Sequence, residues 1–287
     1  MWAILVGMLL VAIDLQYLKE VYFAYDEPVP YKCKGGNTIN IIPVDVKHGL
    51  VFQSSIDIIA FDKNSINDAK VISMSYLEFI IGMMAEAPVF VQKFVNILKL
   101  CLGLEHPAIT FNEQTNKPLI VDEEAGIKIT HKDFEDIRRI ILYQNIPKYD
   151  DEYINPDLKK AMEETDRLRN KDIDMPTFER KCAIITAHCG LSKKEQLEMT
   201  LRSHIMLFDE VCGEIEFTTV RPVALFGGKG DELEHWIFHK KKGKFDGYIT
   251  EKDQLVKQMG GEGSFTNAST DTSRGDSLEQ LFIQGGN

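Results

Sequence analysis

The sequence lacks the short motifs that mark several large enzyme classes. It contains no GxxxxGK(S/T) phosphate loop, no GxGxxG dinucleotide fingerprint, no GxSxG nucleophile elbow and no HExxH zinc-protease motif. The glycine-rich turn at residues 227–230 includes a lysine but not the spacing of a phosphate loop. No pair of carboxylates stands out as a general acid and base. We therefore predict that the protein is not an enzyme, and we assign no catalytic residue, no metal ligand and no cofactor.

Cysteines are few and irregularly spaced. The five are Cys33, Cys101, Cys182, Cys189 and Cys212, an odd number without a CxxC pair. This pattern argues against a disulfide framework and against a zinc ribbon. Three of the five fall on the apolar stripes of predicted helices. We interpret them as small buried hydrophobes in a reducing compartment.

Histidine and cysteine are dense between residues 182 and 212, where His188 and His204 join three of the cysteines. Cys182 and Cys189 are seven residues apart, which on a helix is too far for one tetrahedral ion. Adjacent helical residues diverge, so His188 is not placed to activate Cys189. We interpret this group as core or interface residues.

Long hydrophobic runs are also missing, apart from one at the N-terminus. Residues 2–13 are apolar throughout, but this run is shorter than the ~20 residues that a spanning helix needs. It has neither the basic flank nor the small-residue cleavage site of a secretory signal. The apolar pattern continues through Leu15, Leu18 and Val21, which predicts one helix that starts buried or oligomeric and becomes amphipathic. Membrane association is not favoured, but an interaction protein anchored to a membrane by residues 2–13 stays open as an alternative.

Positive charge is scarce, since 44 acidic residues outnumber 33 basic ones and the formal net charge is −11. Such a surface repels phosphate backbones, so nucleic-acid binding would need a local basic patch. The short run at residues 239–244 is the one candidate, and we interpret it as a solvated turn. We expect the partners to be proteins and not nucleic acid.

The most informative stretch runs from Gly190 to Cys212. Ser192 and Glu195 form a capping box, which marks the start of a helix. The apolar residues that follow lie on one helical face: Leu197, Leu201, Ile205, Phe208 and Cys212. This pattern predicts an amphipathic helix of about five turns, packed against a preceding helix over residues 177–188. We expect Leu197, Leu201, Ile205 and Phe208 to bind a partner.

The rest of the chain predicts an α+β fold that is predominantly α-helical. Caps at Ser75–Glu78 and Thr130–Asp133 begin helices, and Pro88 restarts one that stops at Gly103. Residues 38–46 are predicted to form a strand, residues 50–61 a strand or a helix, and residues 215–225 a strand broken by Pro222. Three short β-prone runs over 108–112, 118–122 and 126–130 predict a small β-meander.

We expect three parts. Residues 1–130 form an N-terminal region with the apolar helix and the meander, and residues 131–259 form a helical, bundle-like domain. Residues 260–287 are rich in Gly, Ser, Thr, Asn and Asp and are predicted to be a flexible tail. The tail contains one apolar cluster that we expect to bind a partner: Leu278, Leu281, Phe282 and Ile283.

His235 and His239 are four residues apart, which on a helix puts both rings on one side. A zinc protease needs a glutamate directly after the first histidine, whereas Trp236 occupies that position here. We favour two surface or half-buried histidines beside Trp236. A metal-dependent hydrolase using His235 and His239 stays open as an alternative.

Three segments resemble parts of tail-assembly and virion-morphogenesis proteins of long-tailed bacteriophages. Residues 190–211 are similar to the C-terminal part of tail-assembly proteins. Residues 62–66 with 72–77, and residues 133–141, resemble runs in larger phage morphogenesis proteins of Gram-positive hosts. Tail-assembly chaperones are usually shorter, and the apolar N-terminal helix and the meander have no counterpart in them, so no functional residue is transferred.

The resemblance implies a non-enzymatic, chaperone-like or structural role in building the tail or baseplate. It also implies that the partners are other phage structural proteins or further copies of the chain, in the host cytoplasm or in the virion.

Overall fold

The computed structural model describes residues 14–66, 68–152, 155–169, 171, 176–227 and 237. The chain divides into two compact units. One comprises residues 1–156 and 174–236, and the other comprises residues 157–173 and 237–287. Helix α8 (Pro156–Arg169) is the described helix of the second unit. Our expected boundary at residue 130 has no counterpart in this division.

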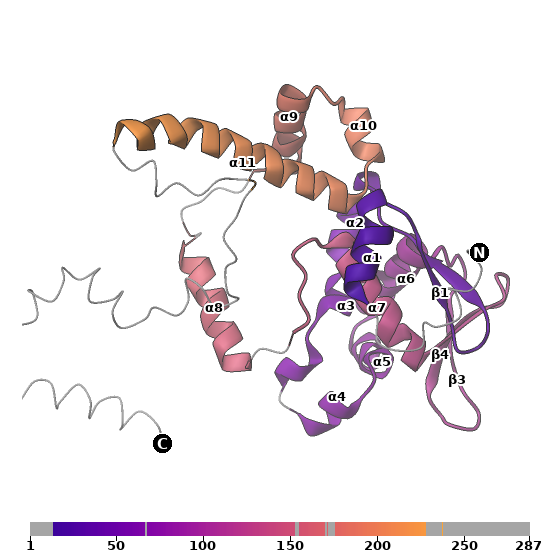
Figure 1. Cartoon of the computed structure of the whole chain (residues 1–287). Helices are drawn as coiled ribbons and strands as arrows, with labels where there is room; N and C mark the ends of the chain where they lie inside the picture. The colour runs from indigo at the N-terminus through magenta and orange to yellow at the C-terminus, as the bar shows by residue number, and fades with distance from the viewer. Residues whose placement is uncertain are drawn as a thin grey trace, which may run out of the picture. The chain divides into compact units, whose positions relative to one another are not determined.

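The first unit is mainly helical, with small antiparallel sheets in its N-terminal half and helices in its C-terminal half (Figure 1). The predicted fold class is therefore confirmed. Its described elements in chain order are α1 (Leu15–Val21), η2 (Phe23–Tyr25), β1 (Val29–Lys32), β2 (Thr38–Ile41), η3 (Val46–His48), α2 (Gly49–Ser55), α3 (Asp57–Ala60), η4 (Lys63–Ile66), α4 (Ala69–Ser73), α5 (Tyr76–Glu86), α6 (Pro88–Leu102), β3 (Ala108–Phe111), β4 (Pro118–Asp122), β5 (Ile127–Thr130), α7 (His131–Asn145), α9 (Phe178–Cys189), α10 (Lys193–Glu198) and α11 (Leu201–Phe226).

The strands pair as two antiparallel sheets. β3, β4 and β5 form the predicted meander in the order β3-β4-β5. β1 and β2 form a separate pair in which Val29 lies opposite Ile41. The strand predicted over residues 38–46 is shorter than expected and ends at Ile41. Pro43 cannot donate to a strand partner, and the Val44 N–H instead donates to the Asn145 side chain at 2.8 Å.

The core of the first unit surrounds α6 and α7. Phe94 of α6 packs edge-on against Phe134 of α7, with 5.6 Å between ring centroids, and both are fully buried. Hydrophobic residues from Leu18 to Tyr143 belong to the same cluster, and Leu201 of α11 joins it. Helix α7 therefore shares its core with the elements before residue 130.

The predicted helix starts are confirmed where the signal is local. Capping boxes form at Ser75–Glu78, Thr130–Asp133 and Ser192–Glu195, each with reciprocal bonds between side chain and backbone. Gly190 ends α9 in the left-handed conformation at φ 74°.

The predicted five-turn helix over residues 193–212 is wrong in one respect, because it is broken at Met199–Thr200 into α10 and α11. Residues 199–201 pair with the chain around Asp45. The Val46 N–H donates to the Met199 carbonyl, and the Leu201 N–H donates to the Val44 carbonyl, both at 2.8 Å. This tertiary pairing replaces helical hydrogen bonds, and Thr200 then caps α11 by accepting from the Ser203 N–H.

The strand predicted over residues 215–225 is also wrong, since α11 continues to Phe226 with Pro222 inside it. The β-branched run at Thr218–Val220 suggested a strand. In the structure, the hydroxyls of Thr218 and Thr219 donate to helical carbonyls one turn earlier, at 2.8 and 2.7 Å. Threonine is therefore accommodated within the helix.

Two further sequence predictions are settled at the N-terminal side. Asp14 is an extended N-cap whose carboxylate accepts from the Tyr17 N–H, so α1 begins at Leu15 and one continuous helix through this position is wrong. The ambiguous segment 50–61 is helical and forms α2 and α3. The apolar run at residues 2–13 lies outside the described residues.

Candidate functional site

The expected partner-binding residues on α10 and α11 have unequal access to solvent. Leu197, Ile205 and Phe208 are half-buried. Leu201 is a correction: it is 6 % exposed and belongs to the core, so it offers no surface to a partner. The tail cluster Leu278, Leu281, Phe282 and Ile283 lies outside the described residues, as do His235 and His239. The hypotheses on these residues stay predictions.

Cys182, Gln196 and His204 form a buried polar cluster between α9, α10 and α11. The Cys182 Sγ lies 3.9 Å from the His204 Nε2, and the Gln196 Oε1 lies 3.4 Å from the same nitrogen. The Gln196 amide also donates to the Cys182 carbonyl at 3.1 Å and to the Thr186 hydroxyl at 2.9 Å. All three members of the cluster are buried. The sequence predicted Cys182 and His204 to be core or interface residues, but it did not predict that they contact each other.

The electrostatics of this cluster do not favour nucleophilic chemistry. Burial raises the pKa of the Cys182 thiol. Burial, with Lys181 nearby, lowers the pKa of His204. Both shifts favour the neutral thiol and the neutral imidazole, whereas a catalytic thiolate needs a cationic or exposed environment. The cluster therefore serves to hold three helices together through satisfied buried polar groups.

A second contact joins α9 and α11 farther along. The His188 Nε2 lies 2.9 Å from the Glu214 carboxylate. Cys182 contacts His204, and His188 contacts Glu214. Later residues of α9 therefore contact later residues of α11. Within the residues that the structure describes, no three His, Cys, Asp or Glu side chains are grouped to hold a metal ion.

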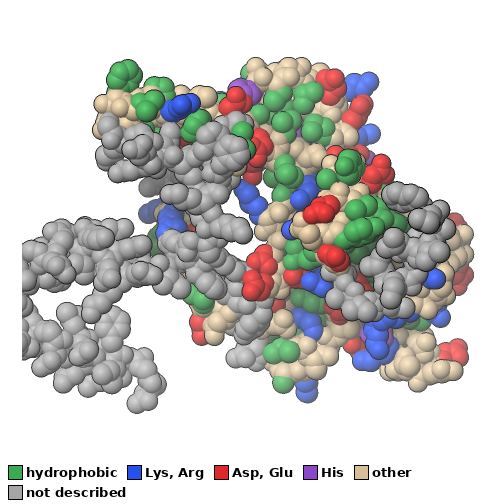
Figure 2. All heavy atoms as spheres, viewed as in Figure 1, with side chains coloured by type: hydrophobic (Ala, Val, Ile, Leu, Met, Phe, Trp, Pro, Cys, Tyr) green, Lys and Arg blue, Asp and Glu red, His purple; other side chains and the backbone are tan. Residues whose placement is uncertain are grey.

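Helix α11 extends well beyond α9 toward its C-terminal end (Figure 1). Its residues after Glu214 include exposed apolar side chains. Val223 is 71 % exposed and Phe226 is 95 % exposed, and Ile215, Val220 and Leu225 are exposed as well. Figure 2 shows hydrophobic side chains at the end of α11. We call Ile215, Val220, Val223, Leu225 and Phe226 the α11 apolar end. The sequence did not predict this surface, because residues 215–225 were expected to form a strand.

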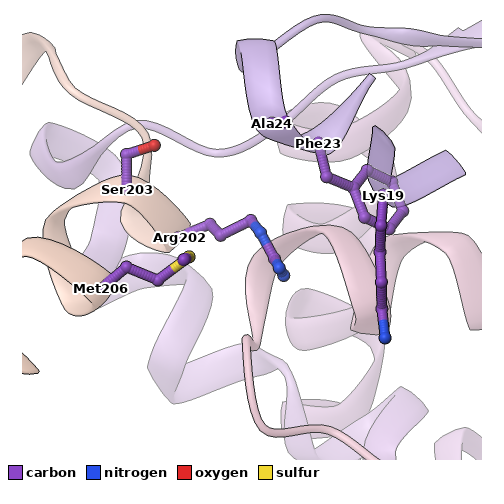
Figure 3. Close-up of a pocket in the computed structure, with 6 residues that line it drawn as sticks. All are labelled: Lys19, Phe23, Ala24, Arg202, Ser203 and Met206. Carbon is purple, nitrogen blue, oxygen red and sulfur yellow. The ribbon is translucent and has the colours of Figure 1, made fainter. Parts of the chain in front are cut away.

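A pocket of about 300 Å³ lies where α1 and η2 meet the first turns of α11 (Figure 3). Two of its side chains are cationic, Lys19 from α1 and Arg202 from α11. Its remaining lining comes from Phe23, Ala24, Ser203 and Met206. Figure 3 shows Arg202 extending from α11 toward Phe23 and Lys19. None of these residues was singled out from the sequence as a site.

Arg202 is held by contacts to neutral groups. Its Nη1 donates to the Tyr143 carbonyl at 3.0 Å, and its guanidinium carbon lies 5.6 Å from the centre of the Phe23 ring. Burial lowers the pKa of Arg202, while the Asp26 carboxylate acts in the opposite direction. Arginine stays protonated at physiological pH despite such a shift.

No helix among the described residues is long and apolar enough to cross a membrane. Comparison of the chain with protein-family models, with curated proteins and with solved structures found no match. A function must therefore be argued from the chain's own residues.

Proposed function

We propose that this chain is a non-enzymatic interaction protein of bacteriophage virion assembly that acts in tail or baseplate morphogenesis. Its partners are other phage structural proteins or further copies of itself, and it acts in the host cytoplasm or in the virion. The assignment to phage assembly rests on the resemblance of residues 190–211, 62–66 with 72–77, and 133–141 to proteins of that class.

The observation that supports an interaction role is the α11 apolar end. Five large apolar side chains are exposed within twelve residues of one helix, Ile215–Phe226. Exposed apolar surface costs free energy at about 25 cal/mol per Å², and clustered exposure marks interaction surfaces. Helices with such a surface are commonly bound by a complementary groove or helix of a partner. The α11 apolar end is therefore the partner-binding surface in this proposal.

Site-specific photo-crosslinking tests the proposal directly. A benzophenone amino acid replaces Val223 in one variant and Lys194, an exposed residue of α10, in a matched control. Each variant is co-expressed with the tail and baseplate genes adjacent to its own gene. We expect cross-links from position 223, and not from position 194, to a tail or baseplate protein or to a second copy.

The substitution Val223→Glu provides a second test, because it removes an exposed apolar side chain from the α11 apolar end without changing the core. This substitution should abolish co-purification of the cross-linked partner while leaving the melting temperature unchanged. The proposal would be contradicted if, in cells that assemble the tail, the residue at position 223 forms no more cross-links than the residue at position 194.

A further inference from the structure

Among the described residues, the pocket between α1, η2 and α11 contains two cations that form no ion pair with a carboxylate. In the described part of the chain, neither Lys19 nor Arg202 has a carboxylate within ion-pair distance. The ammonium of Lys19 instead lies 6.0 Å from the centre of the Tyr143 ring. This is unusual in a protein with 44 acidic and 33 basic residues, where acids are in excess.

The Asp26 carboxylate, whose charge acts on Arg202, is hydrogen-bonded to the start of α11. Asp26 accepts a hydrogen bond from the Thr200 hydroxyl at 2.6 Å and from the Ser203 hydroxyl at 2.8 Å. Both of its oxygens therefore serve the start of α11, and it forms no ion pair with Arg202. The guanidinium has five N–H donors, of which one donates to the Tyr143 carbonyl, so a planar fork remains for a ligand.

The shape and lining of the pocket restrict the ligand. A volume of about 300 Å³ is at the small end for ligand sites and suits a group of a few carbons, not a nucleotide. Phe23, Ala24 and Met206 supply apolar surface beside the two cations. A carboxylate can accept two parallel hydrogen bonds from the guanidinium group. Charge-assisted hydrogen bonds of this type are stronger than hydrogen bonds between neutral groups.

We propose that this pocket binds a carboxylate attached to a short apolar chain. The carboxylate pairs with Arg202 and Lys19, and the apolar chain packs on Met206 and Phe23. Two sources offer this chemistry: a small free acid, or an acidic side chain of a docked protein. The proposal does not depend on phage assembly or on the α11 apolar end.

The test uses the full chain labelled with ¹³C at its methionine methyl groups, with the Met206 signal assigned by Met206→Leu. Glutarate is titrated against glutaramide, which has the same size without the charge. We expect a saturable shift of the Met206 methyl with glutarate, with a dissociation constant of about 1 mM, and none with glutaramide. A capped peptide Leu-Glu-Leu, compared with Leu-Gln-Leu, tests the second source.

Substitutions distinguish binding in the pocket from nonspecific electrostatic attraction to the protein surface. Arg202→Gln should weaken glutarate binding at least about tenfold, because it removes the bidentate partner. Lys19→Gln, at an exposed position that does not endanger folding, should weaken it about threefold, since it removes one partly screened charge. Arg202→Lys, which keeps the charge but loses the fork, should give an intermediate affinity. Arg221→Gln, at the other end of α11, is the matched control and should leave binding unchanged.

The titrations distinguish the two sources of the carboxylate, and some of their outcomes would contradict the proposal. Peptide binding at least about tenfold tighter than glutarate assigns the carboxylate to a protein side chain, and the reverse order assigns it to a small acid. The proposal is overturned if neither acid gives a saturable Met206 shift below about 50 mM. Equal shifts from glutaramide, or unchanged binding in both Lys19→Gln and Arg202→Lys, overturn it as well.

Discussion

The Ser203 hydroxyl lies 2.8 Å from each carboxylate oxygen of Asp26, a residue 177 positions earlier in the chain. Thr200, the N-cap of α11, donates to the same carboxylate at 2.6 Å. Asp26 has a left-handed backbone at φ 57°, which turns the chain between η2 and β1. One side chain thus joins an N-terminal turn to the start of the last described helix, and it places Phe23 opposite Arg202 across the pocket.

Asp26→Ala should destabilise the protein by about 2 kcal/mol. The substitution leaves two hydroxyls of the α11 start without their acceptor and places an alanine in a left-handed conformation that it disfavours. Asp26→Asn is the matched variant, because asparagine tolerates this conformation and keeps one acceptor oxygen, and it should cost about 1 kcal/mol. Urea unfolding at neutral pH measures both. A cost for alanine no greater than that for asparagine would show that the hydroxyl bonds contribute nothing.

Glu78 gives the stability of the protein a defined dependence on pH. Hydrogen bonds from Lys117 and Ser75 lower its pKa from 4.5 to about 2, against an opposing effect of burial. The Lys117 ammonium lies 2.8 Å from one carboxylate oxygen, and the Ser75 N–H lies 2.9 Å from the other. Because the folded pKa is below the unfolded one, the stabilisation is fully present above pH 4.5 and is lost as the pH falls toward 2.

Glu78→Gln should remove this pH-dependent part. The Lys117 side chain is 45 % exposed, so we expect solvent screening to reduce the contribution to about 1 kcal/mol. The difference in unfolding free energy between wild type and variant should be largest above pH 5 and shrink steadily below pH 4. Glu86→Gln, at an exposed position of the same helix, is the control for the loss of one negative charge. A pH-independent difference for Glu78→Gln would refute the assignment.

Gly82 and Gly190 should respond in opposite directions to alanine. Gly82 lies within α5 without a positive φ, and an added Cβ would meet no atom within 4 Å. Gly82→Ala should therefore stabilise the protein by about 0.5–1 kcal/mol through helix propensity. Gly190 has equal space but a φ of 74°, so Gly190→Ala should cost about 1 kcal/mol. Thermal unfolding of the two variants in one buffer checks the signs, and the same sign for both would contradict this account.

Sequence reasoning was most accurate where the determining contacts are local. The caps at Ser75, Thr130 and Ser192 each depend on a residue three positions away, so the spacing alone predicted them. The break at Thr200 depends on pairing with Asp45, which no window of sequence contains. The helical state of Thr218 and Thr219 likewise overrides their β propensity, because the chain around them is already helical and their hydroxyls find helical carbonyls.

The candidate sites were less predictable than the helices for the same reason. The pocket brings Lys19 and Phe23 together with Arg202, from opposite ends of the described chain, and each residue alone is ordinary. The α11 apolar end was visible as a run of apolar residues, but its exposure follows from α9 ending at Cys189 while α11 continues. Burial depends on which elements cover which, and the sequence pattern does not contain that information.

The five cysteines should differ widely in reactivity toward thiol reagents. All are free thiols, but Cys33, Cys101 and Cys182 are buried, whereas Cys189 is exposed. Burial raises the pKa of all three buried thiols, that of Cys33 to about 11, and this depletes the reactive thiolate. In the native protein, iodoacetamide should modify Cys189 at least about a hundred times faster than the buried three, which must await local unfolding.

Pulsed alkylation followed by peptide mass spectrometry measures each site separately. Cys189→Ser should abolish the fast phase without altering the slow ones, and added urea should merge all the rates. Fast native modification of Cys182 would contradict its neutral, buried pairing with His204.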